Sequence, residues 1–73
     1  MKEYVDKNLS KEILDDVFGY LVSQNGGWRP SLMSVYIDMV VKRLYKPEYD
    51  GVLFRKEVIR KMKELEPVLF RRV

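Results

Sequence analysis

Residues 30–45, PSLMSVYIDMVVKRLY, are rich in apolar side chains and decide the predicted fold. Pro30 suits the first position of a helix, because its φ angle is already helical and the N–H that it lacks would have no partner there. Lys46 precedes Pro47, and a residue before proline avoids the helical conformation. The stretch therefore predicts a helix over residues 30–45.

Apolar side chains surround most of this predicted helix. They are Leu32, Met33, Val35, Tyr36, Ile37, Met39, Val40, Val41, Leu44 and Tyr45. The polar residues form a narrow stripe at Ser31, Ser34, Asp38 and Lys42, with only Arg43 away from it. A helix that is apolar on nearly all sides must be buried on nearly all sides. Because two short neighbouring helices offer little cover, we expect a homodimer joined through residues 30–45.

A β-strand over residues 35–41 is the alternative to this helix. Valine, isoleucine and tyrosine, which are frequent here, favour strands as well. The strict alternation of apolar and polar residues that marks a half-buried strand is missing, so the helix stays the prediction.

A predicted amphipathic helix lies on either side of this segment. The first spans residues 10–24, with Ser10 as its N-cap and Gly26 in the sequence that stops it. The other follows the turn KPEYDG at residues 46–51 and ends before Pro67. Its apolar seam is Phe54, Val58, Met62 and Leu65. The expected fold is all-α: a small three-helix bundle, similar to a helix-turn-helix domain.

The chain is short enough for a single domain, residues 1–73. We expect the two ends, residues 1–8 and 67–73, to be less regular tails. A short β-pair between Tyr4-Val5 and the terminal segment VLFRRV, residues 68–73, is a further expectation.

The composition argues against catalysis. The chain has no cysteine and no histidine, which removes disulfides, the usual zinc ligands and the common nucleophile–base pairs. Gly26 and Gly27 lack the spacing of a phosphate-binding loop. Glu12 and Asp16 stand one turn apart, but an exposed helix face explains them better than a cation site. We expect no enzyme, no metal and no cofactor.

No stretch approaches the roughly 18 apolar residues that a membrane-spanning helix needs. The opening Met1-Lys2-Glu3 does not resemble a signal peptide either. We therefore expect no membrane partner and a cytoplasmic location, which would be the host cytoplasm for a viral protein.

Basic residues gather in the second half of the chain. Residues 1–38 carry four basic and six acidic groups, whereas residues 39–73 carry ten basic and five acidic groups. Such a skew is a sign of a nucleic-acid or acidic-protein partner. The candidate binding residues are Lys56, Arg60 and Lys63 at helical spacing opposite the apolar seam, Arg71 and Arg72 in the tail, and Lys42 and Arg43 at the end of the second helix. The alternative interpretation is an ordinary solvated face, in which Arg60 and Glu64 form one of several intrahelical pairs.

Trp28 and Arg29 complete the list of candidate binding residues. A tryptophan beside a helix start most often covers the end of a small core. Tryptophan and arginine are also the residues most enriched at binding hot spots, and these two lie on a turn that contains glycines. Both roles are compatible if only one face of the indole ring is covered.

Two functional hypotheses follow from these patterns. The first is a transcription-type regulator, a DNA-binding protein whose basic C-terminal half contacts nucleic acid. The second is a protein-binding modulator or inhibitor of the kind that viruses and mobile elements encode, which would grip an acidic surface of a host protein such as a polymerase.

Overall fold

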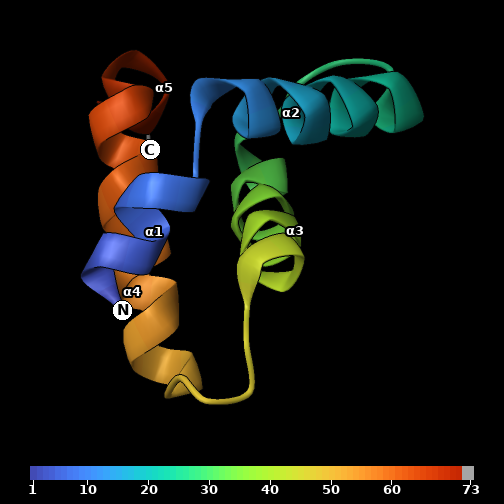
Figure 1. Ribbon diagram of the computed structural model, residues 1–73. Helices are drawn as coiled ribbons and strands as arrows, with labels where there is room; N and C mark the ends of the chain where they lie inside the picture. Colours follow the sequence, from blue (N-terminus) through green and yellow to red (C-terminus); the bar gives the residue numbers. More distant parts are fainter. Residues whose placement is uncertain (72–73) are drawn as a thin grey trace.

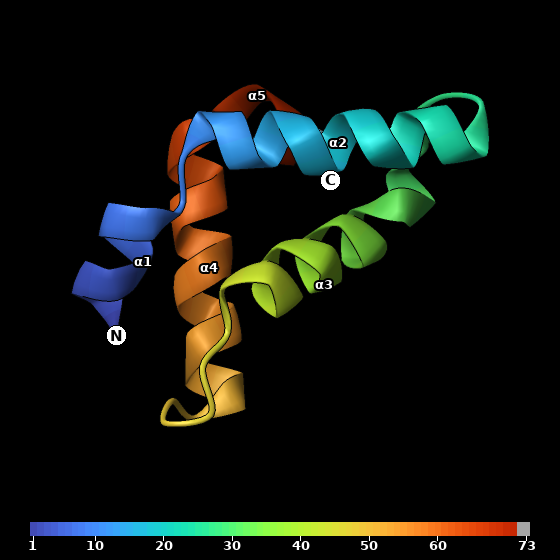
Figure 2. The same ribbon diagram turned by 45° about the vertical axis from the view of Figure 1, so that its right-hand side comes forward.

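Five α-helices and one 3₁₀ turn make up the part of the chain that the computed structural model describes, residues 1–71. In chain order they are α1 (Lys2–Asn8), α2 (Lys11–Asn25), the 3₁₀ turn η1 (Pro30–Leu32), α3 (Met33–Leu44), α4 (Gly51–Leu65) and α5 (Pro67–Arg71). α2 crosses one end of the molecule, α3 descends from it, and α4 stands beside α3 with α1 packed against it (Figures 1 and 2). The fold is therefore a small all-α bundle, as the sequence predicts, with two more helices than expected.

The two longest helices begin and end where local chemistry dictates. The side chain of Ser10 accepts a hydrogen bond from the backbone N–H of Ile13, and Asp50 accepts one from the N–H of Leu53 at 3.0 Å. α2 ends at Gly26, whose φ of 68° lies in the left-handed region that glycine adopts without strain. The N–H of Gly27 then closes the helix end on a carbonyl five residues earlier, as in a Schellman motif.

Residues 30–45 are helical almost throughout, so the alternative of a strand over residues 35–41 is wrong. One chain also covers most of this helix. The buried side chains are Leu32, Met33, Tyr36, Ile37, Val40 and Leu44, while Met39 and Val41 are half-buried against the same core. Val35 is the main exposed apolar side chain of α3, at 41%. The premise that this helix needs a second copy for cover is therefore not met, because α2 and α4 pack on it from two sides.

The N-terminal tail is more regular than expected. Residues 2–8 form α1, which buries Val5 completely and packs on α4. The hydroxyl of Tyr4 donates a hydrogen bond of 2.7 Å to the carbonyl of Leu44 at the end of α3. Burial of one side of this segment outweighs its weak helix-forming tendency, since short helices depend on tertiary packing.

At the other end of the chain, Pro67 stops α4 as predicted but also opens α5. Proline is favoured at a first helical position, so the residue that ends one helix begins the next. The expected β-pair does not form within the described residues, because Tyr4 and Val5 lie in α1 and residues 68–71 lie in α5.

A buried hydrogen bond joins the core to the junction between α4 and α5. The ring of Tyr36 is fully buried, and its hydroxyl donates a hydrogen bond to Oε1 of Glu66. Lys11, at the start of α2, donates to Oε2 of the same carboxylate at 2.7 Å. Burial, and then the hydrogen bond to the Glu66 carboxylate, raise the pKa of Tyr36 far above its ordinary value, so the hydroxyl stays a donor. The side chain of Glu66 is only 9% exposed, and both of its oxygens are occupied.

Tyr36→Phe should destabilise the fold more than a matched change on the surface. The substitution leaves the buried Glu66 carboxylate with one donor fewer, which costs about 1–3 kcal/mol in the free energy of unfolding. Tyr45→Phe is the control: its hydroxyl donates to the carbonyl of Tyr49 at an exposed position, so its loss should cost less than about 0.5 kcal/mol. Urea unfolding measures both, and equal costs would contradict the role assigned to Tyr36.

Candidate binding surface on α4

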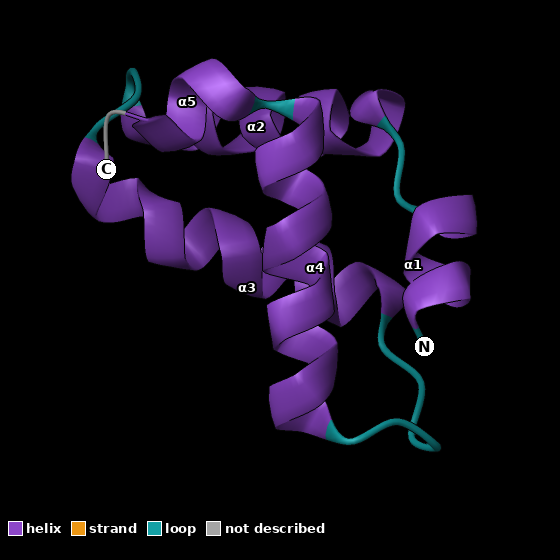
Figure 3. Ribbon diagram, turned by 90° about the vertical axis from the view of Figure 1, so that its left-hand side faces the viewer, coloured by secondary structure: helices purple, strands orange, loops and turns teal. Residues whose placement is uncertain are grey.

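α4 presents one face to the outside of the molecule. Phe54, Val58 and Met62 are completely buried on its inner side, against α3 and α1. Lys56 and Lys63 lie on the opposite side, and both are exposed. Within residues 1–71 neither lysine has a carboxylate at ion-pair distance. Figure 3 views α4 from the side away from α3.

Arg60, the third member of the predicted basic stripe, is already occupied. Its guanidinium contacts Asp6 of α1 at 2.7 Å, Glu57 at 2.9 Å and Glu64 at 2.5 Å. The hydrogen bond from Arg60 lowers the pKa of Asp6 to about 2, and the same carboxylate, followed by Glu57, raises the pKa of Arg60. These bonds join α1 to α4, so Arg60 is a structural residue in this chain.

The other predicted basic residues do not join Lys56 and Lys63 on α4. Lys42 is exposed on the last turn of α3, where Arg43 makes a long ion pair of 3.8 Å with Asp16 of α2. Arg71 is the exposed last residue of α5. Arg72 lies outside the described residues.

Trp28 covers one end of the core. Its ring lies 4.8 Å from that of Phe18 and meets the edge of Tyr36 at 5.7 Å, centroid to centroid. The indole is half-buried, as the interpretation of a core cover predicts. The neighbouring Arg29 is exposed, and its Nη1 donates a 3.3 Å hydrogen bond to the carbonyl of Asn25 at the end of α2. The positive charge of Arg29 thus lies at the C-terminus of α2, where the helix dipole favours a cation.

Sequence reasoning missed the apolar residues on the exposed side of α4. Val52 is 67% exposed and Leu53 is 52% exposed, both in the first turn of the helix. Ile59, which the helical spacing places beside the buried seam, is half-buried and packs partly against the core. The signal was present in the helical spacing, because Val52 falls about 160° around the wheel from Phe54 at 100° per residue. The outer face of α4 therefore combines exposed apolar side chains with two lysines that have no carboxylate partner within residues 1–71.

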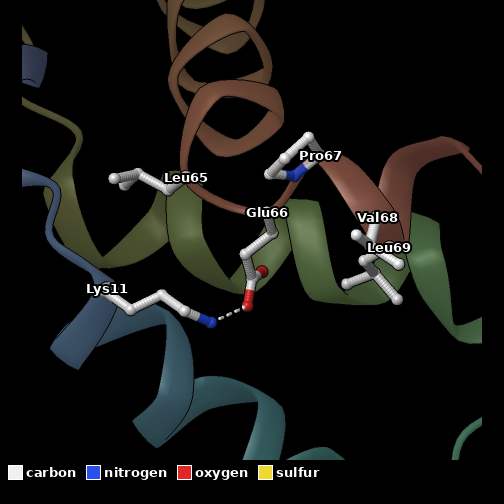
Figure 4. A pocket seen from close by; sticks show the side chains of 6 residues that line it. All are labelled: Lys11, Leu65, Glu66, Pro67, Val68 and Leu69. Atoms are coloured by element: carbon white, nitrogen blue, oxygen red, sulfur yellow. Dashed lines mark hydrogen bonds and ion pairs between the residues drawn. The ribbon is translucent and has the colours of Figure 1, made fainter.

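A shallow cavity of about 460 Å³ lies elsewhere, between the start of α2 and the α4–α5 junction. Its apolar lining is Leu65, Pro67, Val68 and Leu69 (Figure 4). The ion pair between Lys11 and Glu66 crosses it, as the dashed line in Figure 4 shows. Since Tyr36 and Lys11 already bind the two oxygens of Glu66, the polar groups of this cavity serve the fold.

Comparison of this chain with protein-family models, with curated proteins and with solved structures finds no match. Among the described residues, no three or more carboxylates gather closely enough to hold a metal ion. None of the described helices has the length and apolar character needed to cross a bilayer.

Asp6→Asn should make the free energy of unfolding less dependent on pH in the acid range. Because the pKa of Asp6 is lowered to about 2 from its usual 3.8, its bond to Arg60 stabilises the fold fully above about pH 4, and this contribution is lost as the pH falls toward about 2. Urea midpoints across this interval should fall less steeply in the variant than in the parent chain. Glu3→Gln, an exposed change on the same helix, is the control and should leave the slope unchanged. Parallel curves for all three chains would refute the assignment to Asp6.

Proposed function

We propose that this chain acts by binding, as a module that captures an acidic protein partner through the outer face of α4. The observation that carries the proposal is the composition of that face: Lys56 and Lys63 are exposed without carboxylate partners among the described residues, and Val52 is exposed beside them. Protein interfaces combine an apolar centre with polar groups at the rim. Of the two hypotheses that the sequence raises, this is the modulator or inhibitor of another protein.

A nucleic-acid partner has weaker support. Phosphate contacts require available Lys and Arg side chains, and direct reading of bases relies most on Arg, Asn and Gln. α4 contains no Asn or Gln, and its two arginines, Arg55 and Arg60, bind carboxylates of the chain itself. Exposed aliphatic groups such as Val52 gain little against a phosphate backbone. A DNA-binding transcription regulator is therefore the second hypothesis, and a binding titration must distinguish it from the first.

Titration with two polyanions tests the proposal. Poly-glutamate and duplex DNA are each added to the labelled chain at low and high salt, and backbone chemical shifts are followed by NMR. We expect poly-glutamate to shift α4 resonances around Lys56 and Lys63. A Lys56→Ala/Lys63→Ala variant should bind it about five-fold more weakly, because two exposed ion pairs contribute about 1 kcal/mol together.

The matched control is Lys7→Ala/Lys42→Ala, which removes the same charge from exposed positions on α1 and α3. This control should bind poly-glutamate like the parent chain. Tighter binding of DNA than of poly-glutamate, with a steep loss at high salt and dependence on Lys56 and Lys63, would replace the proposal with the nucleic-acid hypothesis. Chemical-shift changes located away from α4, or an equal loss of poly-glutamate affinity in both variants, would show that the outer face of α4 is not the binding surface.

The homodimer expected from residues 30–45 loses its physical support, and we expect a monomer instead. The outward side of η1 and α3 carries Ser31, Ser34, Asp38 and Lys42, which are all exposed and polar, around Val35. A face with this composition can stay exposed to water without a partner. Sedimentation equilibrium over a hundred-fold range of concentration should give the mass of one chain throughout. A mass of two chains that returns to one chain in the Val35→Asp variant would instead support the homodimer.

A further inference from the structure

Four residues on the outer face of α4 follow the spacing of a coiled-coil seam. Val52, Lys56, Ile59 and Lys63 are separated by four, three and four residues, the alternation of a and d positions in a heptad repeat. In that register the aliphatic residues take the d positions and the lysines take the a positions. We call these four residues the outer seam.

The outer seam is open to a partner. Val52, Lys56 and Lys63 are exposed, whereas Ile59 is half-buried because part of it packs against the chain's own core. The seam covers three turns of helix, or about 16 Å at 1.5 Å per residue. α4 is held rigidly beneath it by the completely buried Phe54, Val58 and Met62 on the inner side. A partner therefore meets a straight, preformed row of side chains.

Charge on and beside the outer seam has one sign. The flanking positions of the same register are Leu53, Arg55, Arg60 and Met62, none of which is acidic. Arg55 and Arg60 are already paired with carboxylates of the chain, and Met62 is buried, so the available charge of the seam is that of Lys56 and Lys63. The nearby carboxylates of Glu57 and Glu64 are turned to Arg60. The seam thus combines two positive charges that have no carboxylate partner among residues 1–71 with aliphatic contacts. A complementary surface must place carboxylates and apolar groups in alternation.

We infer that the acidic partner of this chain is an amphipathic α-helix that packs lengthwise along the outer seam. This inference rests on the proposed function and specifies its partner. A helix whose aliphatic residues face Val52 and Ile59, and whose glutamates or aspartates face Lys56 and Lys63, satisfies every group of the seam. Side chains three and four residues apart form the ridges by which helices pack, so a partner with the same spacing fits in register.

A second copy of the chain does not fit this seam. Two parallel copies would place Lys56 against Lys56 and Lys63 against Lys63, and like charges at facing a positions oppose association. In an antiparallel arrangement the same four positive charges would still share one interface with no carboxylate in it. The lysines therefore act against self-association and in favour of a partner of opposite charge.

A pair of synthetic helical peptides tests the inference. The patterned peptide carries Leu and Glu in the alternation of the outer seam, with neutral helix-forming residues elsewhere. The scrambled peptide has the same composition, charge and helicity, but its Leu and Glu do not share one face. Binding is measured by the anisotropy of a fluorescent label, and the location of binding by NMR shifts. We expect the patterned peptide to bind at least about ten-fold more tightly than the scrambled one.

Charge reversal supplies the decisive comparison. Lys56→Glu/Lys63→Glu should abolish binding of the patterned peptide, and a peptide with Lys in place of its Glu should bind this variant but not the parent chain. Val52→Ser should weaken binding of the patterned peptide several-fold while leaving poly-glutamate binding unchanged. Circular dichroism confirms that each variant is folded, which is expected because all three positions are exposed.

The outcomes separate this inference from the proposed function. Equal binding of the two peptides at α4, with loss in Lys56→Glu/Lys63→Glu, would leave an acidic partner in place and overturn the helical one. Failure of both peptides and of poly-glutamate to bind would overturn the proposed function together with the inference. Binding of the patterned peptide away from α4 would overturn the inference as well.

Discussion

A part-buried hydrogen bond from Tyr36 to Glu66 ties together three helix segments of this chain. Tyr36 belongs to α3, Glu66 ends α4, and Lys11 at the start of α2 holds the other carboxylate oxygen. A carboxylate that is almost fully covered is costly unless it is bonded in this way, so the three helix segments must meet at one geometry. This meeting point holds the C-terminal end of α4 against α2 and α3, while the buried Phe54, Val58 and Met62 set which face of α4 points outward.

The basic residues of α4 differ in whether the chain itself supplies a carboxylate for them. Arg55 and Arg60 bind carboxylates of α3, α1 and α4 itself, whereas Lys56 and Lys63 project outward. A guanidinium offers five donors in a rigid plane and can satisfy several carboxylates at once; an ammonium is a strongly hydrated point charge. Both arginines therefore hold helices together, and Lys61 adds ion pairs of 3.7 Å with Asp6 and Glu64. Lys56 and Lys63 are the lysines of α4 that have no carboxylate partner among residues 1–71.

A chain of 73 residues has a small core, and this one extends it with aromatic side chains. Phe18, Trp28 and Tyr36 form one cluster near the end of α2, and Tyr4, Tyr45 and Tyr49 surround Phe54 near the start of α4. Each large ring buries more surface than an aliphatic side chain. These two clusters cover both ends of α3, which explains how one chain shelters a helix that its sequence marks as apolar nearly all round.

The sequence by itself determined the helical class, the N-caps at Ser10 and Asp50, the stop at Gly26 and the buried seam of α4, because these features depend on spacing and backbone chemistry within a few residues. The same local rules misjudged residues 2–8 and 67–71, whose short helices pack on α4 and on the core. The tertiary structure alone decided which basic residues are available. Arg60 and Lys56 are equivalent in the sequence pattern, but Asp6, 54 positions away from Arg60, reaches one of them and not the other. Long-range ion pairs of this kind depend on how whole helices are placed, and no periodicity along the chain records that placement.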